Sequence, residues 1–582
     1  MVFLSSDRFN PGLLARFARR RLAPNRYDLI ALLLIGAVAA LVVHGAQQMT
    51  LPVGRLHTEP VVLDPWRLPE YALRSTLRMF AAIFASLLFT FTIATLAAKS
   101  HKAELLIVPM LDILQSIPIF GFLTFTSAFF IGLAPGSELG VELVAIFTVF
   151  TSQAWNMAFS FYQSLRTLPA DLDEVSRQFG LSPWQRFRKL ELPFATPALV
   201  WNTMMSMSGG WFFIVASEAF TVGTTSVSLP GIGSWIAVAN ERQDFVSVAW
   251  AIGAMAVVIL IYDQFLFRPI VAWADKFRFE QTASEDKPES WFYDVLRRTR
   301  LFRRLWAPLA ALIKITPRPR ARRVIAAPTL GPRASFWIDR IWLGCVLIAA
   351  AWAAWTVGRY IITNLSLREI IVVAGMGFLT LIRVLVLIAL ASAIWVPIGV
   401  WIGLRPAWSQ RIQPVAQFLA AFPANVFFGA VVFLVIGLHL NPDIWLSPLI
   451  ILGTQWYILF NVIAGASALP TDLKEAAGVF HVRSWLWWRS LVLPGIFPYY
   501  VTGALTASGG SWNASVAAEL VTWGQTTVQA RGLGAYIAKS TKAGDFHRVA
   551  LGIAVMSIFV ILLNRTLWRP LYAFAERRLR LN

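Results

Sequence analysis

The chain has 582 residues, of which 57% are hydrophobic and only 14% are charged. Soluble proteins carry about 25% charged residues, so this composition excludes a water-soluble protein and indicates an integral membrane protein. The 51 basic and 31 acidic residues leave a net charge of +20, which fits either nucleic-acid binding or the basic cytoplasmic loops of a membrane protein.

Few side chains in the sequence could carry redox or metal chemistry. The single cysteine, Cys345, excludes a disulfide framework and a cysteine-based metal or iron–sulfur centre. The six histidines are scattered without metal-ligand spacing, and no convergent acid/base cluster is visible. We therefore expect neither catalytic residues nor a metal site, and a membrane enzyme is the least supported class of function.

Twelve apolar segments are long enough to cross a bilayer, which takes roughly 20 residues. The first span follows several arginines and lacks a small-residue cleavage site, so we expect an anchor rather than a signal peptide. The fold class predicted is an all-α membrane protein. The twelve spans are 28–48, 76–98, 113–133, 142–164, 197–219, 245–266, 340–358, 379–403, 413–437, 444–465, 498–518 and 547–565.

The distribution of basic residues orients these spans. If the N-terminus is cytoplasmic and the spans alternate, the cytoplasmic segments hold 39 of the 51 lysines and arginines. The positive charge is thereby explained without nucleic acid, and we expect both termini in the cytoplasm.

The chain divides into two membrane regions joined by one long basic segment. We expect an amphipathic stretch at 291–309, typical of a helix on the inner leaflet. The predicted parts are a basic N-terminus (1–27), a first six-span repeat (28–268), a basic cytoplasmic linker (269–339), a second six-span repeat (340–570) and a basic tail (571–582).

The two membrane regions are copies of one unit, offset by 301 residues. Segment 168–197 aligns with 469–498 without a gap, and 12 of the 30 positions are identical. An even number of spans returns the chain to its starting side, so the repeats are parallel and related by a pseudo-twofold axis along the membrane normal. Further matches at this offset are Gly209/Gly510, Trp211/Trp512, Glu218/Glu519, Gly231/Gly532, Gly233/Gly534, Asp244/Asp545 and Phe245/Phe546, while Pro109 and Pro118 match Pro414 and Pro423 at offset 305.

The best-matched segment is a cytoplasmic loop between the fourth and fifth spans of each half. Pro169 and Asp171 ahead of Glu174 indicate a helix start, and a second helical stretch ends in Leu192-Pro193. We call this helix–turn–helix segment the elbow (169–193 and 470–494). Such a projecting elbow suits docking into a groove of another protein.

The elbow resembles the Glu-Ala-Ala loop of binding-protein-dependent ABC transporter permeases. That loop has a glutamate, a glycine six residues later and a Leu-Pro about a dozen residues further on. The resemblance covers roughly 75–270 and 378–570, and His481 departs from it where the family has glycine. It assigns ATPase coupling to Glu174, Phe179, Gly180, Leu192, Pro193, Glu475, Ala476, Ala477, Phe480, Leu493 and Pro494.

This resemblance implies several partners and a place in the cell. The chain has no Gly-x-x-x-x-Gly-Lys-Ser/Thr loop, so ATP and Mg²⁺ are expected on two separate ABC ATPase subunits, with no cofactor in this chain. A separate extracytoplasmic solute-binding protein is implied as well. The expected location is the bacterial cytoplasmic (inner) membrane, crossed many times.

The segments after the fifth span resemble the nitrate/sulfonate/taurine branch of these permeases, so we expect transport of a small anion of the nitrate, sulfonate or bicarbonate type. Fused permeases of the iron(III) or thiamine type and a twelve-span secondary transporter are the alternatives. The small-residue stretches serve either close helix packing or the translocation path. They comprise Ser208, Gly209, Gly210, Trp211, Gly509, Gly510, Ser511, Trp512 and Asn513.

Two carboxylates lie near the outer end of the fifth spans. Glu218 and Glu519 are ionisable groups in apolar surroundings, which are candidates for function by default. Because a carboxylate is a poor ligand for an anion, we assign them to a gate or to the scaffold.

Overall fold

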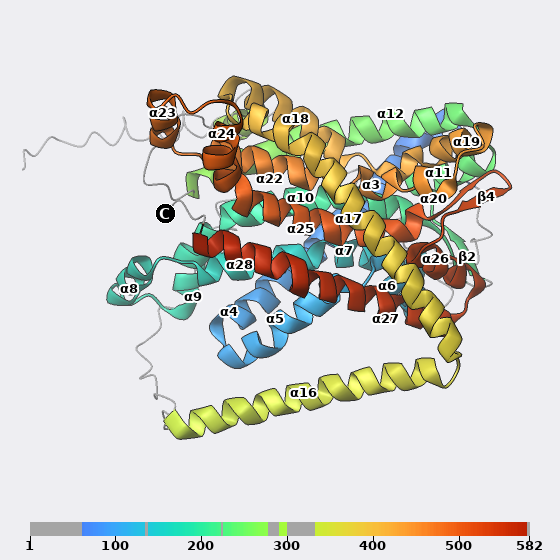
Figure 1. The fold of residues 1–582 in the computed structure, drawn as a ribbon, viewed down its shortest axis with the longest axis horizontal. Coiled ribbons are helices and arrows are strands. Elements are labelled where there is room, and N and C mark those ends of the chain that lie inside the picture. The colour runs from blue at the N-terminus through green and yellow to red at the C-terminus, as the bar shows by residue number, and fades with distance from the viewer. Residues whose placement is uncertain (1–60, 134–137, 223–224, 278–289, 300–331, 579–582) are drawn as a thin grey trace, which may run out of the picture. The chain divides into compact units, whose positions relative to one another are not determined.

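The structure is a computed structural model that describes residues 61–133, 138–222, 225–277, 290–299 and 332–578 (Figure 1). Nearly all of these residues are helical. They belong to two compact units: a larger one (49–167, 201–260, 332–582) and a smaller one (1–48, 168–200, 261–331). The predicted first span at 28–48 and basic segment 1–27 lie outside the described residues.

Six helices in the described residues are long and apolar enough to cross a membrane, or up to eight if each of two bent helix pairs is one span. These six cover Pro65–Lys99, Phe245–Phe277, Arg340–Ile362, Leu367–Gly403, Ser484–Ala518 and Phe546–Ala575. The bent pairs are Val415–Ala421 with Ala424–Gly437, at 72°, and Pro442–Leu452 with Gln455–Ser467, at 45°. The chain is thus a multi-helix membrane protein, and the number of twelve spans stays a prediction.

Three predicted spans lie in helices outside this set, namely 113–133, 142–164 and 197–219. In the second of them, polar side chains such as Thr148 and Gln153 lower the hydropathy, yet both are fully buried against neighbouring helices. A helix shielded from lipid by protein does not need an apolar surface all round. This is why the hydropathy criterion leaves this helix out although the sequence predicts a span there.

The first half of the larger unit is built from helices and one hairpin. Its elements are η2 (Pro65–Arg67), α3 (Leu68–Phe89), η3 (Thr90–Ala94), α4 (Thr95–Lys99), α5 (His101–Ser116), α6 (Ile119–Leu133), α7 (Glu138–Arg166), β1 (Ala219–Val222), β2 (Thr225–Ser228) and α11 (Ile232–Glu241). Helices α10 (Leu192–Glu218) and α12 (Phe245–Tyr262) have residues in both units.

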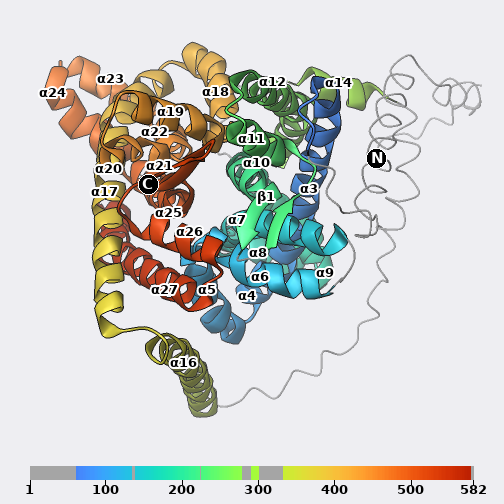
Figure 2. The same ribbon diagram turned by 90° about the vertical axis from the view of Figure 1, so that its right-hand side faces the viewer.

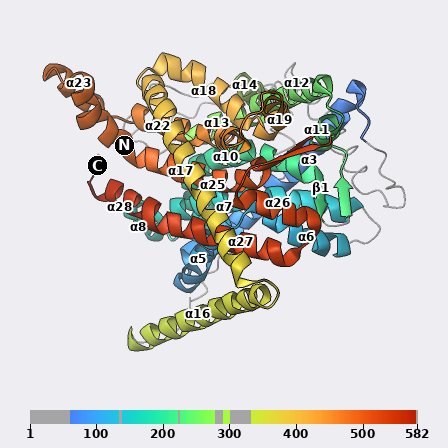
Figure 3. The same cartoon turned by 45° about the vertical axis from the view of Figure 1, so that its right-hand side comes forward.

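The second half repeats this order and lies wholly in the larger unit. It begins with α16 (Pro332–Ile362), which lies at the edge of this unit in Figure 3 and contacts α5 through Trp342 and His547 through Tyr360. The other elements are α17 (Leu367–Gly403), α18 (Pro406–Ala421), η7 (Ala424–Phe427), α19 (Phe428–Gly437), α20 (Pro442–Trp445), α21 (Pro448–Leu452), α22 (Gln455–Ser467), α23 (Thr471–Val479), α24 (Ser484–Trp487), η8 (Trp488–Val492), α25 (Leu493–Ala518), β3 (Leu520–Trp523), β4 (Thr526–Gln529), α26 (Leu533–Ala543), α27 (Phe546–Leu563), η9 (Asn564–Trp568) and α28 (Arg569–Arg578).

The smaller unit holds the first elbow and part of the linker. An aromatic contact joins α14 to the segment before it, because the Phe265 ring lies 5.4 Å from that of Trp291. The predicted amphipathic stretch is helical over its described part, and the rest of the linker up to residue 331 lies outside the described residues. The elements are α8 (Ala170–Gln178), α9 (Pro183–Arg186), η4 (Phe187–Glu191), η5 (Asp263–Phe267), α13 (Arg268–Ala274), η6 (Asp275–Phe277) and α14 (Trp291–Arg298).

Each half breaks a helix at a matched proline. Ile117 is extended between α5 and α6, and Phe422 is extended between α18 and η7. Both precede a proline, Pro118 or Pro423, and a proline disfavours helical backbone in the residue before it. The offset of 305 in the sequence therefore marks a repeated structural feature, which we call the helix break.

Two antiparallel hairpins, β1–β2 and β3–β4, follow the fifth helices and were missed by the all-helical prediction. Each pairs four residues with four, too few for an alternating pattern to stand out. Both hairpins lie at one end of the larger unit, the end that faces the viewer in Figure 2, whereas α23 and α24 lie at the other end.

Helix α12 begins at a matched aspartate. Asp244 accepts hydrogen bonds from the backbone N–H groups of Val246 and Ser247, at 3.0 and 3.1 Å. The Ser247 hydroxyl also donates to Asp244 and holds the pKa of that carboxyl below its usual range. Asp545 caps α27 in the same way through the N–H of Arg548, so the repeated Asp-Phe pair is a helix start.

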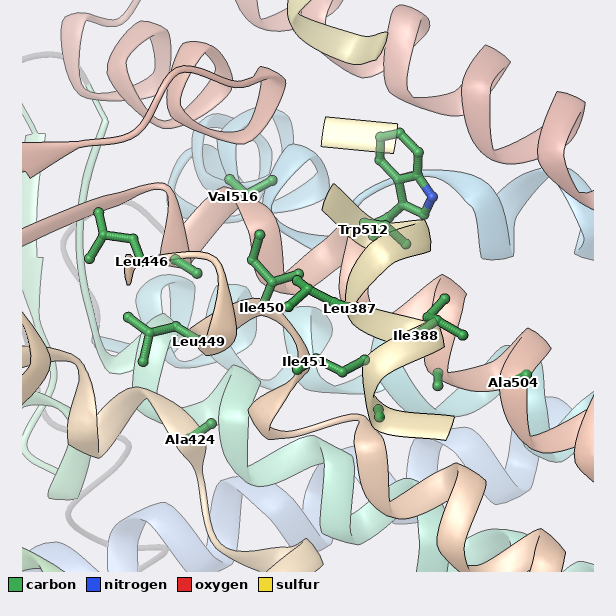
Figure 4. Close-up of a cluster of buried hydrophobic side chains, with 14 of the residues drawn as sticks. Leu387, Ile388, Ala424, Leu446, Leu449, Ile450, Ile451, Ala504, Trp512 and Val516 are labelled. Carbon is green, nitrogen blue, oxygen red and sulfur yellow. The ribbon is translucent and has the colours of Figure 1, made fainter. Parts of the chain in front are cut away.

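The core of the second half surrounds α25 (Figure 4). Trp512 is 1% exposed, and Leu387, Ile450 and Val516 belong to the same buried cluster. The α17 and α22 helices supply the facing side chains. Burial of large apolar residues between helices fixes the fifth helix in place.

Substitution of the Gly-x-Gly pair that follows each hairpin is predicted to destabilise the protein. A Cβ on Gly233 would lie 2.2 Å from the carbonyl oxygen of Val215, which is backbone and cannot yield. We expect Gly233→Ala to lower the free energy of unfolding by about 1–3 kcal/mol. Thermal unfolding of the detergent-purified protein measures this. Gly253→Ala in α12 is the control, since a Cβ there meets nothing within 4 Å; equal stability of the two variants would contradict the packing argument.

Candidate functional site

A buried arginine lies between two buried glutamates in the first half. Arg78 of α3 donates to Glu142 of α7 through Nε and Nη2, at 2.5 and 2.7 Å, and to Glu218 of α10 through Nη1, at 2.6 Å. The side chains of all three are at most 1% exposed. The hydroxyl of Ser75 and the backbone N–H of Gly233 also donate to Glu218, each at 2.6 Å. Helices α3, α7, α10 and α11 thus meet at one ionic cluster.

The second half repeats this cluster. Arg383 of α17 donates to Glu519, which caps the C-terminal end of α25, at 3.0 Å and to Asp443 of α20 at 3.1 Å. The Thr380 hydroxyl and the N–H of Ala535 also donate to Glu519. Residues 75, 78, 142 and 218 correspond to 380, 383, 443 and 519, so the cluster obeys the internal repeat.

The two clusters differ in their access to solvent. Asp443 is 35% exposed and accepts a hydrogen bond from the N–H of Arg531, whereas Glu142, its counterpart, is buried. The second cluster therefore reaches the surface of the protein and the first does not.

The glycines of the Gly-x-Gly pair make room for these carboxylates. A Cβ on Gly231 would lie 2.3 Å from Glu218, and one on Gly532 would lie 2.2 Å from Glu519. The matches Gly231/Gly532 and Glu218/Glu519 in the sequence therefore reflect one contact between a glycine and a glutamate that occurs in both halves. The arginines were missed, although each is a rare charge inside a predicted apolar span and the two match at offset 305.

The small-residue stretch of α10 packs closely. A Cβ on Gly210 would lie 2.8 Å from Gln153 Nε2, and one on Gly209 would lie 2.9 Å from the hydroxyl of Tyr457. Ser208 donates to a carbonyl of its own helix, and Trp211 is fully buried. These contacts are those of tightly packed helices.

The matching stretch of α25 has a more open position. A Cβ on Gly510 would lie 2.6 Å from Thr454, and Ser511 shares a hydrogen bond with the hydroxyl of Thr454, at 2.9 Å. Gly509 has no neighbour within 4 Å of such a Cβ. Asn513 accepts a hydrogen bond from the backbone N–H of Ile119 in the first half, at 2.6 Å.

The first elbow is braced by ion pairs. Asp173 pairs with Arg186 at 2.6 Å, and Arg186 pairs with Glu191 at 3.0 Å. Gly180 ends α8 with φ +60°, a conformation that glycine adopts without steric cost. Glu174 is exposed and Phe179 is 78% exposed, whereas Leu192 and Pro193 are partly buried at the start of α10.

The second elbow has the same shape with other side chains. Phe480 is 79% exposed, and Glu475 is exposed on α23. His481 has φ +50° where Gly180 stands in the first half, so the departure from the glycine pattern keeps the left-handed turn at an energetic cost. Carbonyl groups of Ala476 and Ala477 close this turn, and Leu493-Pro494 begins α25.

Comparison with known proteins identifies the family of this chain. Residues 90–268 and 395–581 each match the family described as binding-protein-dependent transport system inner membrane component. The two matches cover more than half of the chain and fall on the two repeats. The chain belongs to this family. The predicted resemblance to ABC transporter permeases is thereby confirmed.

Individual relatives in this family are permease subunits. The nitrate import permease protein NrtB of Leptolyngbya laminosa is 28% identical over 184 residues, which are 31% of this chain and 62% of the relative. The bicarbonate transport system permease protein CmpB of Synechococcus elongatus is 26% identical over 177 residues, 30% of this chain and 60% of the relative. The glycine betaine/carnitine transport permease protein GbuB of Listeria monocytogenes is 27% identical over 203 residues, 35% and 65%. The chain spans about three fifths of the nitrate and bicarbonate relatives it matches.

Removing the arginine of the buried cluster is predicted to destabilise this family member strongly. Arg78→Ala leaves Glu142 and Glu218 buried without a countercharge, which costs about 3–5 kcal/mol of unfolding free energy. Thermal unfolding in detergent measures the loss.

Two further variants provide the comparison. Arg383→Ala should cost less, because its partner Asp443 is 35% exposed and can be solvated. Arg177→Ala removes an exposed ion pair with Asp173 and should leave the unfolding midpoint nearly unchanged. An Arg78→Ala variant as stable as Arg177→Ala would refute the role of the cluster.

Proposed function

We propose that the chain is the transmembrane permease subunit of an ATP-driven ABC importer. In this proposal the two halves form the translocation path for a small anion of the nitrate, sulfonate or bicarbonate type, delivered by a solute-binding protein. The observation that carries the proposal is the repeat of one exposed elbow in two family-matched halves. The protein would lie in the bacterial inner membrane with both termini in the cytoplasm.

The elbows are the proposed contacts with two ABC ATPase subunits. Phe179 and Phe480 occupy the same place in the repeat and expose more than three quarters of their surface. An exposed aromatic ring on a rigid projection is a typical anchor for a groove in a partner protein. ATP and Mg²⁺ would bind to the ATPase subunits, since the chain has no phosphate-cradling loop.

The arrangement of elements in the larger unit supports a role in transport rather than a purely structural role. The second elbow and the hairpins lie at opposite ends of this unit (Figure 1). With the elbow in the cytoplasm, the hairpins face the side from which a binding protein would deliver solute. Glu218 and Glu519 are proposed to act as scaffold, because each is held by an arginine and by backbone N–H groups.

The solute class is proposed from the relatives. Nitrate and bicarbonate permeases match this chain, which supports a small anion over the iron(III), thiamine and secondary-transporter alternatives. Glycine betaine is the second candidate, because the betaine permease of Listeria monocytogenes matches a similar share of the chain.

The solute is tested on the purified complex with its binding protein. Native mass spectrometry of that binding protein, followed by uptake of the ligand found, should give a small anion and ATP-dependent accumulation in vesicles. A betaine ligand would move the proposal to the second candidate. A complex that accumulates neither class of solute with ATP would refute the proposed function.

The elbow assignment predicts a loss of ATPase binding. Phe179→Asp and Phe480→Asp each place a charge where an apolar anchor is expected, so copurification of the ATPase subunits and uptake should fall at least tenfold. Pull-down of the complex and vesicle uptake measure the two effects.

The control replaces an equally exposed aromatic residue outside the elbows. Trp66 is 90% exposed ahead of α3, and Trp66→Asp should leave assembly unchanged. Normal assembly and uptake in both phenylalanine variants would exclude the elbows as the coupling sites.

A further inference from the structure

Two hydrogen bonds inside the larger unit cross from one half to the other in a symmetric way. The N–H of Ile119 donates to Asn513 Oδ1 at 2.6 Å, and Asn425 Nδ2 donates to the carbonyl oxygen of Phe212 at 3.0 Å. Position 212 corresponds to 513, and positions 119 and 120 correspond to 424 and 425. Each bond therefore joins the small-residue stretch of one half to the helix break of the other. We call this pair of bonds the cross-half latch.

The helix break explains why such bonds form. Ile119 is the first residue of α6, and the first N–H groups of a helix have no acceptor within it. In an apolar environment an unsatisfied N–H costs free energy, so an acceptor from another helix is required. Asn513 supplies that acceptor from the opposite half.

The second bond of the latch leaves the oxygen of the asparagine amide without a hydrogen bond. Asn425 Oδ1 is buried and has no hydrogen-bond partner among the described residues. The amide thus makes one bond across the halves while its oxygen remains unsatisfied. Such a group gains a hydrogen-bond partner if it becomes exposed to water or solute.

A second layer of cross-half contacts lies at the hairpins. The Phe245 ring of the first half lies 4.6 Å from that of Trp523 in β3. In the matching place, Phe546 of the second half packs against the buried cluster that contains Val222 of β1. Positions 245 and 222 correspond to 546 and 523, so this aromatic layer also follows the repeat.

We propose that the cross-half latch and the aromatic layer close the translocation path between the two halves. The proposal rests on the permease function argued above. Parting of the halves breaks both bonds and releases two hydrogen-bond donors, the Ile119 N–H and the Asn425 amide, into the opened space. Hydrogen-bond donors suit a small anion, whereas the carboxylates Glu218 and Glu519 stay paired with Arg78 and Arg383. Asn513 and Asn425 thereby set how readily the path opens.

The experiment measures opening directly with a cysteine probe. Gly509→Cys is introduced with Cys345→Ser, because a side chain at 509 enters open space on α25. A membrane-impermeant thiol reagent is added outside right-side-out vesicles that hold the whole complex with its ATPase subunits. We expect Asn513→Ala and Asn425→Ala each to raise the labelling rate about twofold to tenfold, as the loss of one hydrogen bond predicts.

Two control variants separate the latch from general loosening. Asn513→Asp keeps an acceptor for the Ile119 N–H and should label slowly, like the parent. Asn461→Ala removes an asparagine bond of the same kind that stays within one half, from Nδ2 to the carbonyl oxygen of Tyr457. Its labelling rate should also be unchanged.

Separate outcomes refute the latch and the transport function. Unchanged labelling in both alanine variants, with intact complex and normal uptake, overturns the latch. An equal rise in the labelling rate in Asn461→Ala overturns the latch as well, because the effect is then not specific to hydrogen bonds between the halves. If the alanine variants label faster while the parent complex shows no ATP-dependent uptake, the latch stands as a contact between halves and the importer proposal fails.

Discussion

The pairing of one arginine with carboxylates between the helices of each half is the interaction on which the architecture depends. Charges removed from water are costly, so fully buried Arg78 and partly buried Arg383 are stabilised by Glu218 and Glu519 within hydrogen-bond distance. Those carboxylates need backbone donors as well, which the Gly-x-Gly turns after the hairpins supply. The helices that carry Arg78, Glu142 and Glu218, their counterparts in the second half, and the segments after the hairpins are thereby tied together in each half.

Because each half is rigid, movement of an elbow can move the half to which it belongs. The second elbow is continuous with α25, the helix that carries Trp512 in the core and Glu519 in the ionic cluster. Movement at the elbow end of α25 is then transmitted to the second half, because packed cores shift as bodies rather than deform. The contacts between halves include the two asparagine bonds, a backbone bond from the Gly524 N–H to the Asn240 carbonyl oxygen at 2.9 Å, and several aromatic contacts.

The sequence is sufficient to predict the repeat, the elbows and the glutamates, since identical residues at a fixed offset can be recognised without knowing which residues are close in space. It does not predict which arginine pairs with which carboxylate, because the residues of one cluster, such as Ser75 and Glu218, are far apart in the chain. The hairpins escape because four-residue strands carry no usable alternation. The prolines at 118 and 423 were seen as matches, but the bend that each imposes needs the neighbouring helices to be recognised. Hydropathy also undercounts spans whose polar side chains, such as Gln153, are buried by protein.

Fusion of the two halves allows them to differ where identical copies could not. Where Asn513 accepts with its side-chain amide, its counterpart Phe212 accepts with a backbone carbonyl, although both bonds of the latch run from the helix break to the fifth helix. One asparagine accepts from a helix start and the other donates to a helix interior. The ionic clusters differ in the same manner, closed around Glu142 and open to solvent at Asp443. The two halves therefore meet with unlike groups at matched positions, which two identical copies related by a strict twofold axis cannot do.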